Sequence, residues 1–421
     1  MVGGSLRDMM LGRTAHDWDL ATDARPEQIQ ATFPDSFYEN RFGTVTVRRG
    51  DVTYQITTFR REHDYADFRR PHRVEFGDTI EVDLARRDFT VNAMAWGGRL
   101  GDEPALVDPF GGRADVEARL LRAVGEPDPR FAEDALRMVR AVRLAATLGL
   151  AIESATLVAI RRHADLVRHL SGERIASELE KLMTADRPSV GLRLAAEAGV
   201  LERISPELAA QRGVAQNKVA GEDLWDHTLR AVDAVPADRP IVRLAALFHD
   251  IGKPATAADG HFLGHDTVGA EMAEDLLRRL HFPRETIDRV RHLVRHHMFS
   301  YEPGWSDTAV RRFLGKIGSP EIEELFALRE ADNAGSGLPA DAGGLAELRR
   351  RVADQIAADV ALELRDLAID GDDLIAELGL EPGPTIGRVL DELLEQVVGD
   401  PALNDRPTLL VLAQAMLADD R

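Results

Sequence analysis

The chain has 421 residues, of which 44% are hydrophobic and 29% charged, and it contains no cysteine. Its length exceeds one compact core, so we expect two to four domains. The absence of a long apolar run argues against a membrane protein, and the absence of cysteine excludes disulfides and thiolate sites. Any metal must be held by His, Asp or Glu. No charged-then-apolar leader precedes the first motif, so a cytoplasmic location is expected.

The formal net charge of −20 argues at first against a nucleic-acid partner, because phosphate contacts need Lys or Arg. The chain has only four lysines, so nearly all of its positive side chains are arginines. Arginine suits bidentate contacts with phosphates and base edges. Local arginine clusters therefore matter more here than the total charge.

The first part of the chain mixes strand-like and helix-like segments. The segments 42–47 and 52–59 show strand-like alternation with β-branched residues, and a turn at 49–51 separates them. This pattern predicts a β-hairpin. Residues 24–32, with Pro26 near their start, predict a short helix. The segment 60–73 is rich in arginine and acidic residues and predicts a charged loop.

The earliest candidate chemistry lies in the sequence GGSLRD at 3–8, followed by DWD at 17–19. Residues two apart on a strand point to the same face, so Asp17 and Asp19 can present two carboxylates to one point. Mg²⁺ prefers such oxygen ligands, and two metals can activate a 3′-hydroxyl and stabilise a leaving pyrophosphate. Gly3 and Gly4 lack a Cβ and would let backbone N–H groups approach a triphosphate. Each piece alone is weak, since a D-x-D is usually a solvated turn.

After Pro129 helical periodicity dominates. Asp128 is typical of a helix cap with Pro129 in the first turn, and the sequence predicts one long amphipathic helix through Leu148 with a stop at Gly149. On that helix Asp134, Arg137 and Arg140 lie one turn apart on a shared face that Arg143 continues.

An Asp and an Arg held side by side offer one acceptor and several donors, which can pair with the Watson–Crick edge of cytosine or adenine. Protein side chains would then take the place of a template. The alternative interpretation is an ordinary salt bridge on a solvated helix.

A second cluster begins where the apolar helix-like run 241–248 ends in HDIGKP at 249–254. His227 precedes it, and His265, His296-His297 and Asp332 follow. Imidazole and carboxylate ligands on neighbouring helices suit Mg²⁺, Mn²⁺, Ni²⁺ or Zn²⁺ and phosphoester hydrolysis. The Gly/Ala-rich stretch 334–344 predicts a linker or long loop.

The combination of GGSLRD, DWD and RRDFTVNA at 86–93, in this order, resembles the nucleotidyltransferase head shared by class II CCA-adding enzymes and bacterial poly(A) polymerases. The string EDALRMVRAVRLAATLGL at 133–150 resembles the templating helix of that family, and GERI at 172–175 with Glu178 resembles the segment that supports it. The resemblance implies that Asp17 and Asp19 are catalytic and hold Mg²⁺, with Asp83 or Asp88 as a further carboxylate. It implies nucleotide contacts for Gly3, Gly4, Arg7, Arg87, Asp88, Asn92, Asp134, Arg137, Arg140 and Arg143.

The histidine cluster resembles the HD phosphohydrolase superfamily. That resemblance implies a second divalent metal held by His227, His249, Asp250 and Asp332, with His265 and His297 (or His296) as candidates to complete the site. The whole chain most resembles HD-bearing CCA enzymes of actinobacterial type. The expected fold is α+β, with a small mixed-sheet head (1–124), an all-α neck (125–205), a helical HD domain (206–335) and a helical, tRNA-binding tail (336–421).

The resemblance implies addition of CCA to the 3′ end of tRNA from CTP and ATP, with a flexible loop containing Arg60, Arg69 and Arg70 assisting the change from C to A. Hydrolysis of phosphoester ends by the HD module is an additional hypothesis. Two alternatives stay open, a poly(A) polymerase and an HD phosphohydrolase with an inactive, RNA-binding head. Family members carry a helix and most of a strand before the Gly-Gly motif, so this chain is expected to begin inside that strand.

Overall fold

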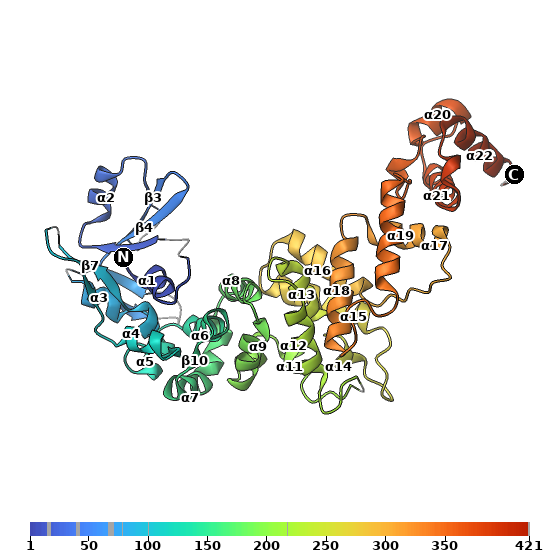
Figure 1. The fold of residues 1–421 in the computed structure, drawn as a ribbon. Coiled ribbons are helices and arrows are strands. Elements are labelled where there is room, and N and C mark those ends of the chain that lie inside the picture. The colour runs from blue at the N-terminus through green and yellow to red at the C-terminus, as the bar shows by residue number, and fades with distance from the viewer. Residues whose placement is uncertain are drawn as a thin grey trace. The chain divides into compact units, whose positions relative to one another are not determined.

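The computed structural model describes residues 1–14, 18–38, 43–65, 71–77, 79–99, 101–216 and 218–419. It divides into two compact units, Met1–Val214 with Asp275–Arg284, and Ala215–Glu274 with Glu285–Arg421 (Figure 1). The first unit contains a small mixed sheet followed by helices, and the second is helical, so the predicted α+β class is confirmed. Among the described residues, no helix combines the length and apolar composition that crossing a bilayer requires.

A four-stranded sheet with the order β1-β4-β3-β2 forms the centre of the head. Strand β4 (Val52–Thr58) pairs parallel with β1 (Trp18–Thr22) and antiparallel with β3 (Thr44–Arg49), and β2 (Phe37–Tyr38) forms the edge. The predicted hairpin is confirmed, with Gly50 in the turn at a φ of 59°. The predicted short helix is α2 (Pro26–Thr32), which lies against the sheet and buries Ile29 against Val45 and Val47 (Figure 1).

Short elements complete the head. They are α1 (Gly3–Met10), α3 (Ile80–Ala85), η1 (Thr90–Asn92), β7 (Ala95–Gly97), β8 (Ala105–Val107), α4 (Gly112–Glu117) and β9 (Leu120–Leu121). Val2 forms a single β-bridge with Ala95, so the segment before α1 lies beside β7 as a strand residue would. The predicted loop at 60–73 is wrong over most of its length, because β5 (Arg60–Tyr65) and β6 (Pro71–Phe76) pair antiparallel. Arg69 and Arg70 lie outside the described residues.

The single long helix expected from residue 128 is wrong. The chain instead forms α5 (Pro127–Glu133) and α6 (Leu136–Leu148), separated by Asp134 in an extended conformation with φ −143° and ψ 105°. The Asp134 carboxylate accepts the Leu136 N–H at 3.0 Å, which is the short-range bond by which Asp favours a helix start over a helix interior. The residue before α5 is Glu126, so Asp128 is not its cap. Gly149 ends α6 at a φ of 64°, as predicted.

Further helices and one short strand complete the first unit. They are β10 (Ala151–Ile152), α7 (Ser154–His163), η2 (Ala164–His169), α8 (Gly172–Met183), α9 (Pro188–Glu197), α10 (Leu201–Ile204) and α11 (Pro206–Ala209). Helix α6 packs against both α8 and α9. The helix that was expected to read bases is therefore supported along its length by the helices that follow it in the chain.

The next helices lie around the histidine cluster, and apart from residues 275–284 they belong to the second unit. They are α12 (Leu224–Ala234), α13 (Pro240–Phe248), α14 (Lys253–Thr256), α15 (His265–Arg279), α16 (Arg284–His296), α17 (Asp307–Ile317) and α18 (Ile322–Gly335). The apolar run 241–248 is α13, as predicted, and it packs with α12 and α18. The expected loop at 334–344 is largely confirmed, since α18 ends at Gly335 and the next helix starts at Leu345.

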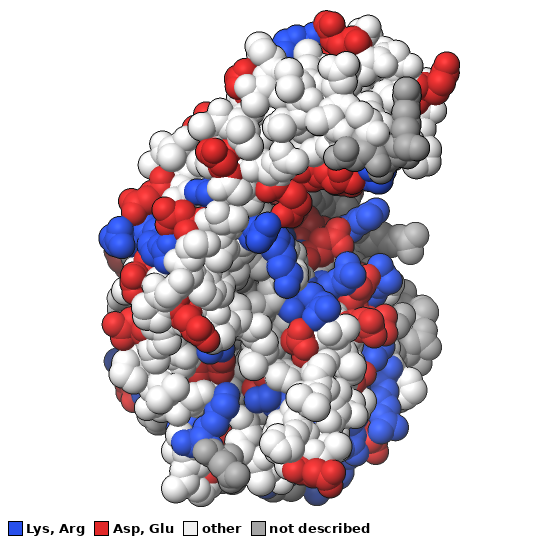
Figure 2. Space-filling model, turned by 90° about the vertical axis from the view of Figure 1, so that its right-hand side faces the viewer, with Lys and Arg blue, Asp and Glu red and all other residues white. Residues whose placement is uncertain are grey.

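The last part of the chain is helical and has a core of its own. Its elements are α19 (Leu345–Ala357), η3 (Leu364–Asp366), α20 (Gly371–Leu378), α21 (Pro384–Gly399), η4 (Pro401–Leu403) and α22 (Arg406–Asp419). Leu374, Val389, Leu393, Val397 and Leu409 form its buried centre. Acidic and basic side chains are interspersed on the face shown in Figure 2, so the net charge of −20 does not make that face uniformly acidic.

Candidate functional site

The start of α1 brings a glycine, a carboxylate and an arginine together in the head. Val2 N–H donates to the carbonyl of Asp19 at 2.9 Å, which joins this segment to β1. Gly3 has a φ of 66°, and a Cβ at this position would collide with the guanidinium of Arg87 and lie 3.6 Å from Asp19 Oδ2. The left-handed backbone conformation therefore favours glycine here, and Arg87 would have to move to make room for a Cβ. Asp17 lies outside the described residues, so Asp19 alone represents the predicted carboxylate pair.

Arg7 lies on α1 one turn after the Gly-Gly pair. A Cβ added at Gly4 would lie 3.5 Å from Arg7 Nη2, so the guanidinium passes directly over the glycine backbone. Arg7 Nη1 donates to Asn92 Oδ1 at 2.6 Å, and Arg7 Nε donates to Asp8 Oδ1 at 2.9 Å. These bonds hold a buried positive charge beside the backbone that was expected to receive a triphosphate.

The two candidates for a further carboxylate, Asp83 and Asp88, are both buried and both paired with arginines. Asp83 accepts from Arg86 Nε at 2.9 Å and from Arg87 Nη2 at 3.2 Å. Asp88 forms an ion pair with Arg140 at 3.1 Å. Both carboxylates are thus already engaged by arginines in this structure.

The predicted base-reading residues are held by different partners. The expected common helical face is wrong for Asp134, because its extended backbone places it before α6. Arg174 of α8 donates from one nitrogen to both Asp134 oxygens, at 3.0 and 2.7 Å. Arg137 donates to Glu133 at 2.6 Å and to the carbonyl of Arg86 at 3.1 Å.

The segment 172–178 makes the supporting contacts that its sequence suggested. Arg174 binds Asp134, and Glu178 accepts a hydrogen bond from Arg143 Nε. Both contacts join α8 to the region around the start and middle of α6. Asp134 and Arg143 are thus each held by a charged partner on a second helix.

The histidine cluster brings all six predicted metal-binding residues together. They form two groups of possible ligands, and within each group the ligand atoms lie within 4.8 Å of one another. The first group is His227, His249 and Asp332, and the second is Asp250, His265 and His297. Asp250 connects the groups, since its Oδ2 lies 3.1 Å from His249 Nε2 and its Oδ1 lies 3.3 Å from His265 Nε2. Of the two alternatives at 296–297, His297 belongs to the cluster.

The imidazole orientations fit metal binding. His249, His265 and His297 each place Nδ1 within 2.7 to 2.8 Å of the carbonyl three residues earlier, so Nδ1–H donates and Nε2 keeps its lone pair. His227 Nε2 and His249 Nε2 face each other at 3.0 Å. The buried Nε2 atoms of His265 and His297 both lie near Asp250 Oδ1, at 3.3 and 3.7 Å. Converging imidazole nitrogens and carboxylate oxygens are a ligand set that suits a divalent metal.

The electrostatics of the cluster keep its carboxylates ionised. Burial raises the pKa of Asp250, but the neighbouring His249, His227 and His265 outweigh it and hold the pKa well below its ordinary value. The pKa of Asp332 is likewise lowered, because the His227 hydrogen bond and nearby charges outweigh burial. Burial lowers the pKa of His249, which favours its neutral, metal-binding form.

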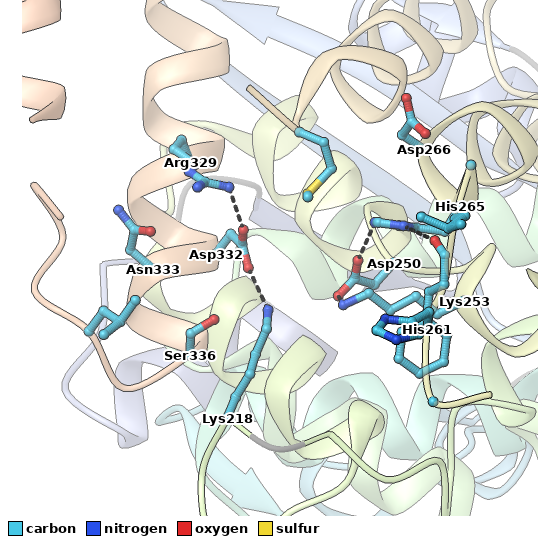
Figure 3. A pocket seen from close by; sticks show the side chains of 16 residues that line it. Lys218, Asp250, Lys253, His261, His265, Asp266, Arg329, Asp332, Asn333 and Ser336 are labelled. Atoms are coloured by element: carbon cyan, nitrogen blue, oxygen red, sulfur yellow. Dashed lines mark hydrogen bonds and ion pairs between the residues drawn. The ribbon is translucent and has the colours of Figure 1, made fainter. Parts of the chain in front are cut away.

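Three cations that the sequence did not single out as functional surround these carboxylates. Figure 3 shows Asp332 between Lys218 and Arg329, at 3.3 and 3.1 Å, and Asp250 beside Lys253 at 2.7 Å. All three line a pocket of about 740 Å³ together with both carboxylates. Two of these pairs join residues three apart in the sequence, Arg329 with Asp332 and Lys253 with Asp250, and this spacing is the signal that could have found them.

The fold is that of a nucleotidyltransferase head followed by a helical HD module that contains two groups of possible metal ligands. Residues 1–122 match the Poly A polymerase head domain, residues 149–212 the Probable RNA and SrmB-binding site of polymerase A, and residues 202–334 the HD domain. The CCA-adding enzyme of Geobacillus kaustophilus is 33% identical over 96% of this chain and 90% of that protein. The chain belongs to the CCA-adding enzyme family.

Solved structures agree with this assignment. The crystal structure of the Bacillus stearothermophilus CCA-adding enzyme in complex with CTP is 29% identical, covers 100% of this chain and 93% of its own, and has a TM-score of 0.71. The Thermotoga maritima CCA-adding enzyme complexed with tRNA is 21% identical, covers 99% and 90%, and has a TM-score of 0.58, which shows a shared fold.

Proposed function

We propose that this protein adds CCA to the 3′ end of tRNA from CTP and ATP, using side chains to select the base. Membership in the CCA-adding enzyme family is the broadest support. The observation that supports the chemistry most directly is the convergence of Gly3, Asp19 and Arg87 at the start of α1. In this reaction the terminal 3′-oxygen forms a bond to the α-phosphorus while the bond to pyrophosphate breaks.

In the proposed site, the head residues bind the triphosphate. The Gly3 and Gly4 backbone admits the phosphates closely, and the guanidiniums of Arg7 and Arg87 neutralise their charge. Asp17 and Asp19 would hold Mg²⁺, which when bound neutralises charge on the triphosphate and on the leaving pyrophosphate. We include Asp88, Asn92, Arg140 and Arg143 in the wall of the site.

Asp134 and Arg137 are proposed to read the base. Cytosine and adenine share an exocyclic amino donor next to a ring nitrogen acceptor on the Watson–Crick edge. A carboxylate can accept from the amino group while a guanidinium donates to the ring nitrogen. Uracil presents a carbonyl and an N–H in those places, so it would face two mismatched pairs. Arg174 supports this role by fixing both oxygens of Asp134.

The four-part division 1–124, 125–205, 206–335 and 336–421 remains a prediction, as does a cytoplasmic location. That Arg60, Arg69 and Arg70 assist the change from C to A is also still a prediction, although Arg60 lies in β5 and not in a loop. The competing activity within the same class is a poly(A) polymerase. The deciding experiment supplies tRNA lacking CCA with labelled CTP and ATP, separately and together. We expect addition that stops after CCA, and long A tails on unrelated RNA would contradict the proposal.

Substitution of Asp19→Ala separates an active head from one that only binds RNA. The proposed mechanism requires nucleotide addition to fall by orders of magnitude, because the carboxylate is a metal ligand. Arg113→Gln, which breaks an exposed ion pair with Glu117 in α4, is the matched control and should leave addition unchanged. Unimpaired addition by Asp19→Ala would reject the assigned role.

A second activity, hydrolysis of phosphoester ends, is supported by the two groups of metal-binding residues in the HD module. A divalent metal bound there would act as a Lewis acid on a phosphoester. Lys218, Lys253 and Arg329 line the pocket and suit an anionic phosphate. Metal-loaded protein should hydrolyse 2′,3′-cyclic phosphates or simple phosphodiesters, and His249→Ala should abolish this and lower metal binding while nucleotide addition continues. Failure of the metal-loaded protein on both substrates would remove the hypothesis.

A further inference from the structure

A turn between two helices of the HD module lies against the start of α8. Helix α15 ends at Arg279 and α16 begins at Arg284, and residues 279–282 form what we call the α15–α16 turn. Residues 275–284 belong to the first compact unit, as α8 does. The segment 202–334 that matches the HD domain therefore supplies one turn to the unit that contains the templating segment.

The turn closely approaches the backbone of Gly172, the first residue of α8. A Cβ at Gly172 would lie 2.5 Å from the carbonyl oxygen of Arg279 and 2.8 Å from the Cα of Leu280. Both are backbone atoms, so neither can swing aside as a side chain could. Since an ordinary contact begins at 3.4 Å, a Cβ would push the turn and α8 apart by about 1 Å. Glycine at this position thus allows the turn and the helix to touch.

The α15–α16 turn is itself firmly held. The Phe282 N–H donates to the Leu277 carbonyl at 3.0 Å, which closes the end of α15. Leu280 and Phe282 are buried, at 3% and 5% exposed. Arg279 donates from Nη1 and Nη2 to the two carboxylate oxygens of Glu207 in α11, at 2.9 and 3.1 Å. A bidentate pair of this kind fixes direction as well as distance, so the turn gives α8 a fixed surface to pack against.

The first turn of α8 lies between this surface and the templating segment. Ser171 precedes the helix, but within the described part of the chain its side chain accepts no capping hydrogen bond from it. Arg174, two residues after Gly172, donates to both oxygens of Asp134. The start of α8 thus contacts the α15–α16 turn through Gly172 and the proposed base-reading carboxylate through Arg174. A displacement of the helix start would therefore be passed directly to Asp134.

We propose that the α15–α16 turn positions α8 for base selection, because it sets where the helix begins and so where Arg174 holds Asp134. The inference rests on the proposed nucleotidyl transfer and on the assignment of Asp134 to base reading. Gly172 and Arg279 are positioning residues that act through Arg174 and do not contact the nucleotide themselves. The HD module thereby has a structural role in nucleotide addition that is separate from its metal ligands.

The test measures kcat/KM for CTP and for UTP with the full chain, on tRNA ending before CCA. Gly172→Ala should lower kcat/KM for CTP by about 10-fold and reduce the ratio of CTP to UTP incorporation, because a misplacement of about 1 Å can cost up to about 100-fold. Arg279→Met removes only the half-exposed pair with Glu207 and should cost about 3-fold, and Arg279→Lys should recover part of that loss. Gly315→Ala is the matched control, since a Cβ at this glycine of α17 would lie 3.3 Å from the carbonyl oxygen of Leu362.

A double variant separates positioning from a general loss of stability. In Arg174→Met the clamp on Asp134 is already absent, so adding Gly172→Ala should change kcat/KM for CTP and the ratio of CTP to UTP by less than about 2-fold. A loss of folded protein alone would instead lower incorporation of both nucleotides alike, with and without Arg174→Met, and would leave the ratio unchanged.

The outcomes separate this inference from the proposed function. A wild-type ratio of CTP to UTP in both Gly172→Ala and Arg279→Met would overturn the inference, and so would losses that multiply in the double variant. If the wild-type protein incorporates no nucleotide, the proposed function fails and the inference falls with it. Should Gly172→Ala not fold, as judged by circular dichroism, Arg279→Met with and without Arg174→Met gives the same comparison.

Discussion

The contact between Arg174 and Asp134 allows a quantitative prediction about base selection. Arg174 supplies one nitrogen to both carboxylate oxygens, at 3.0 and 2.7 Å, and both side chains are about one-fifth exposed, at 21% and 18%. A hydrogen bond to a charged group contributes about 1.5–3 kcal/mol. Because the pair is partly exposed, we take the lower part of this range. Substitution of Arg174→Met should then reduce kcat/KM for CTP and for ATP by about 10- to 30-fold.

The assay is single-nucleotide incorporation into tRNA ending before CCA, with CTP, ATP, UTP and GTP supplied separately. Arg174→Met keeps the aliphatic stem, so packing against α6 is preserved while the charged clamp is lost. We expect discrimination against UTP to fall with the loss of CTP incorporation, because an unclamped Asp134 no longer imposes a fixed acceptor. Arg162→Met, which breaks an exposed pair with Asp128 in the neck, is the control. If Arg174→Met keeps wild-type rates and wild-type rejection of UTP, the assignment of Asp134 to base reading is refuted.

Three further predictions concern other contacts. Gly3→Ala should abolish most CTP incorporation. It should also destabilise the protein by more than about 1–2 kcal/mol, which is the cost of a non-glycine residue in the left-handed region. The control Gly12→Ala, at a φ of 71° with open space around it, should show this backbone cost alone in urea titrations. Asp88→Asn should lower the free energy of unfolding equally at about pH 8 and about pH 5. The pKa of Asp88 in the folded protein lies below 3.8, so its ion pair is intact at both values and is lost only as the pH falls through that folded pKa. A smaller destabilisation at pH 5 than at pH 8 would contradict this. Arg311→Met removes a buried guanidinium that donates to the carbonyls of Val398 and Gly399 at 2.6 and 3.0 Å. It should lower the free energy of unfolding in urea by about 3 kcal/mol. Arg312→Met, which breaks an exposed ion pair, should lower it little.

The fold was predictable where local patterns agree with packing. The β3–β4 hairpin follows from alternation around Gly50, α13 follows from its apolar run, and α6 ends at Gly149 as its sequence indicates. The predictions at Asp134 and at 60–73 were wrong because the sequence pattern there competes with a hydrogen bond or strand pairing that periodicity and charge do not show. Asp134 looks helical by periodicity, but its carboxylate bonds to the Leu136 N–H and interrupts the helix. The charge-rich segment at 60–73 looked like a loop, but its two sides pair as strands.

The candidate sites were predictable in their residue types and less so in their pairings. The sequence grouped six candidate metal ligands because His and Asp at helix ends form a recognisable set, and the structure brings these six side chains together. Lys218 and Arg329 were missed, since a cation beside a buried carboxylate is a product of packing between distant segments. For the same reason the sequence paired Asp134 with Arg137, although the structure pairs Asp134 with Arg174 and Arg137 with Glu133.

The interruption between α5 and α6 has a consequence for how specificity can evolve. If Asp134 and Arg137 shared one rigid helical turn, any shift that suited one would displace the other. Because Asp134 is anchored by α8 and Arg137 by α5 and the end of α3, each can be adjusted by substitutions at its own anchor. If Asp134 and Arg137 read the base as proposed, acceptor and donor are separately tunable, and a lineage could change its preference between C and A through a residue that does not contact the nucleotide.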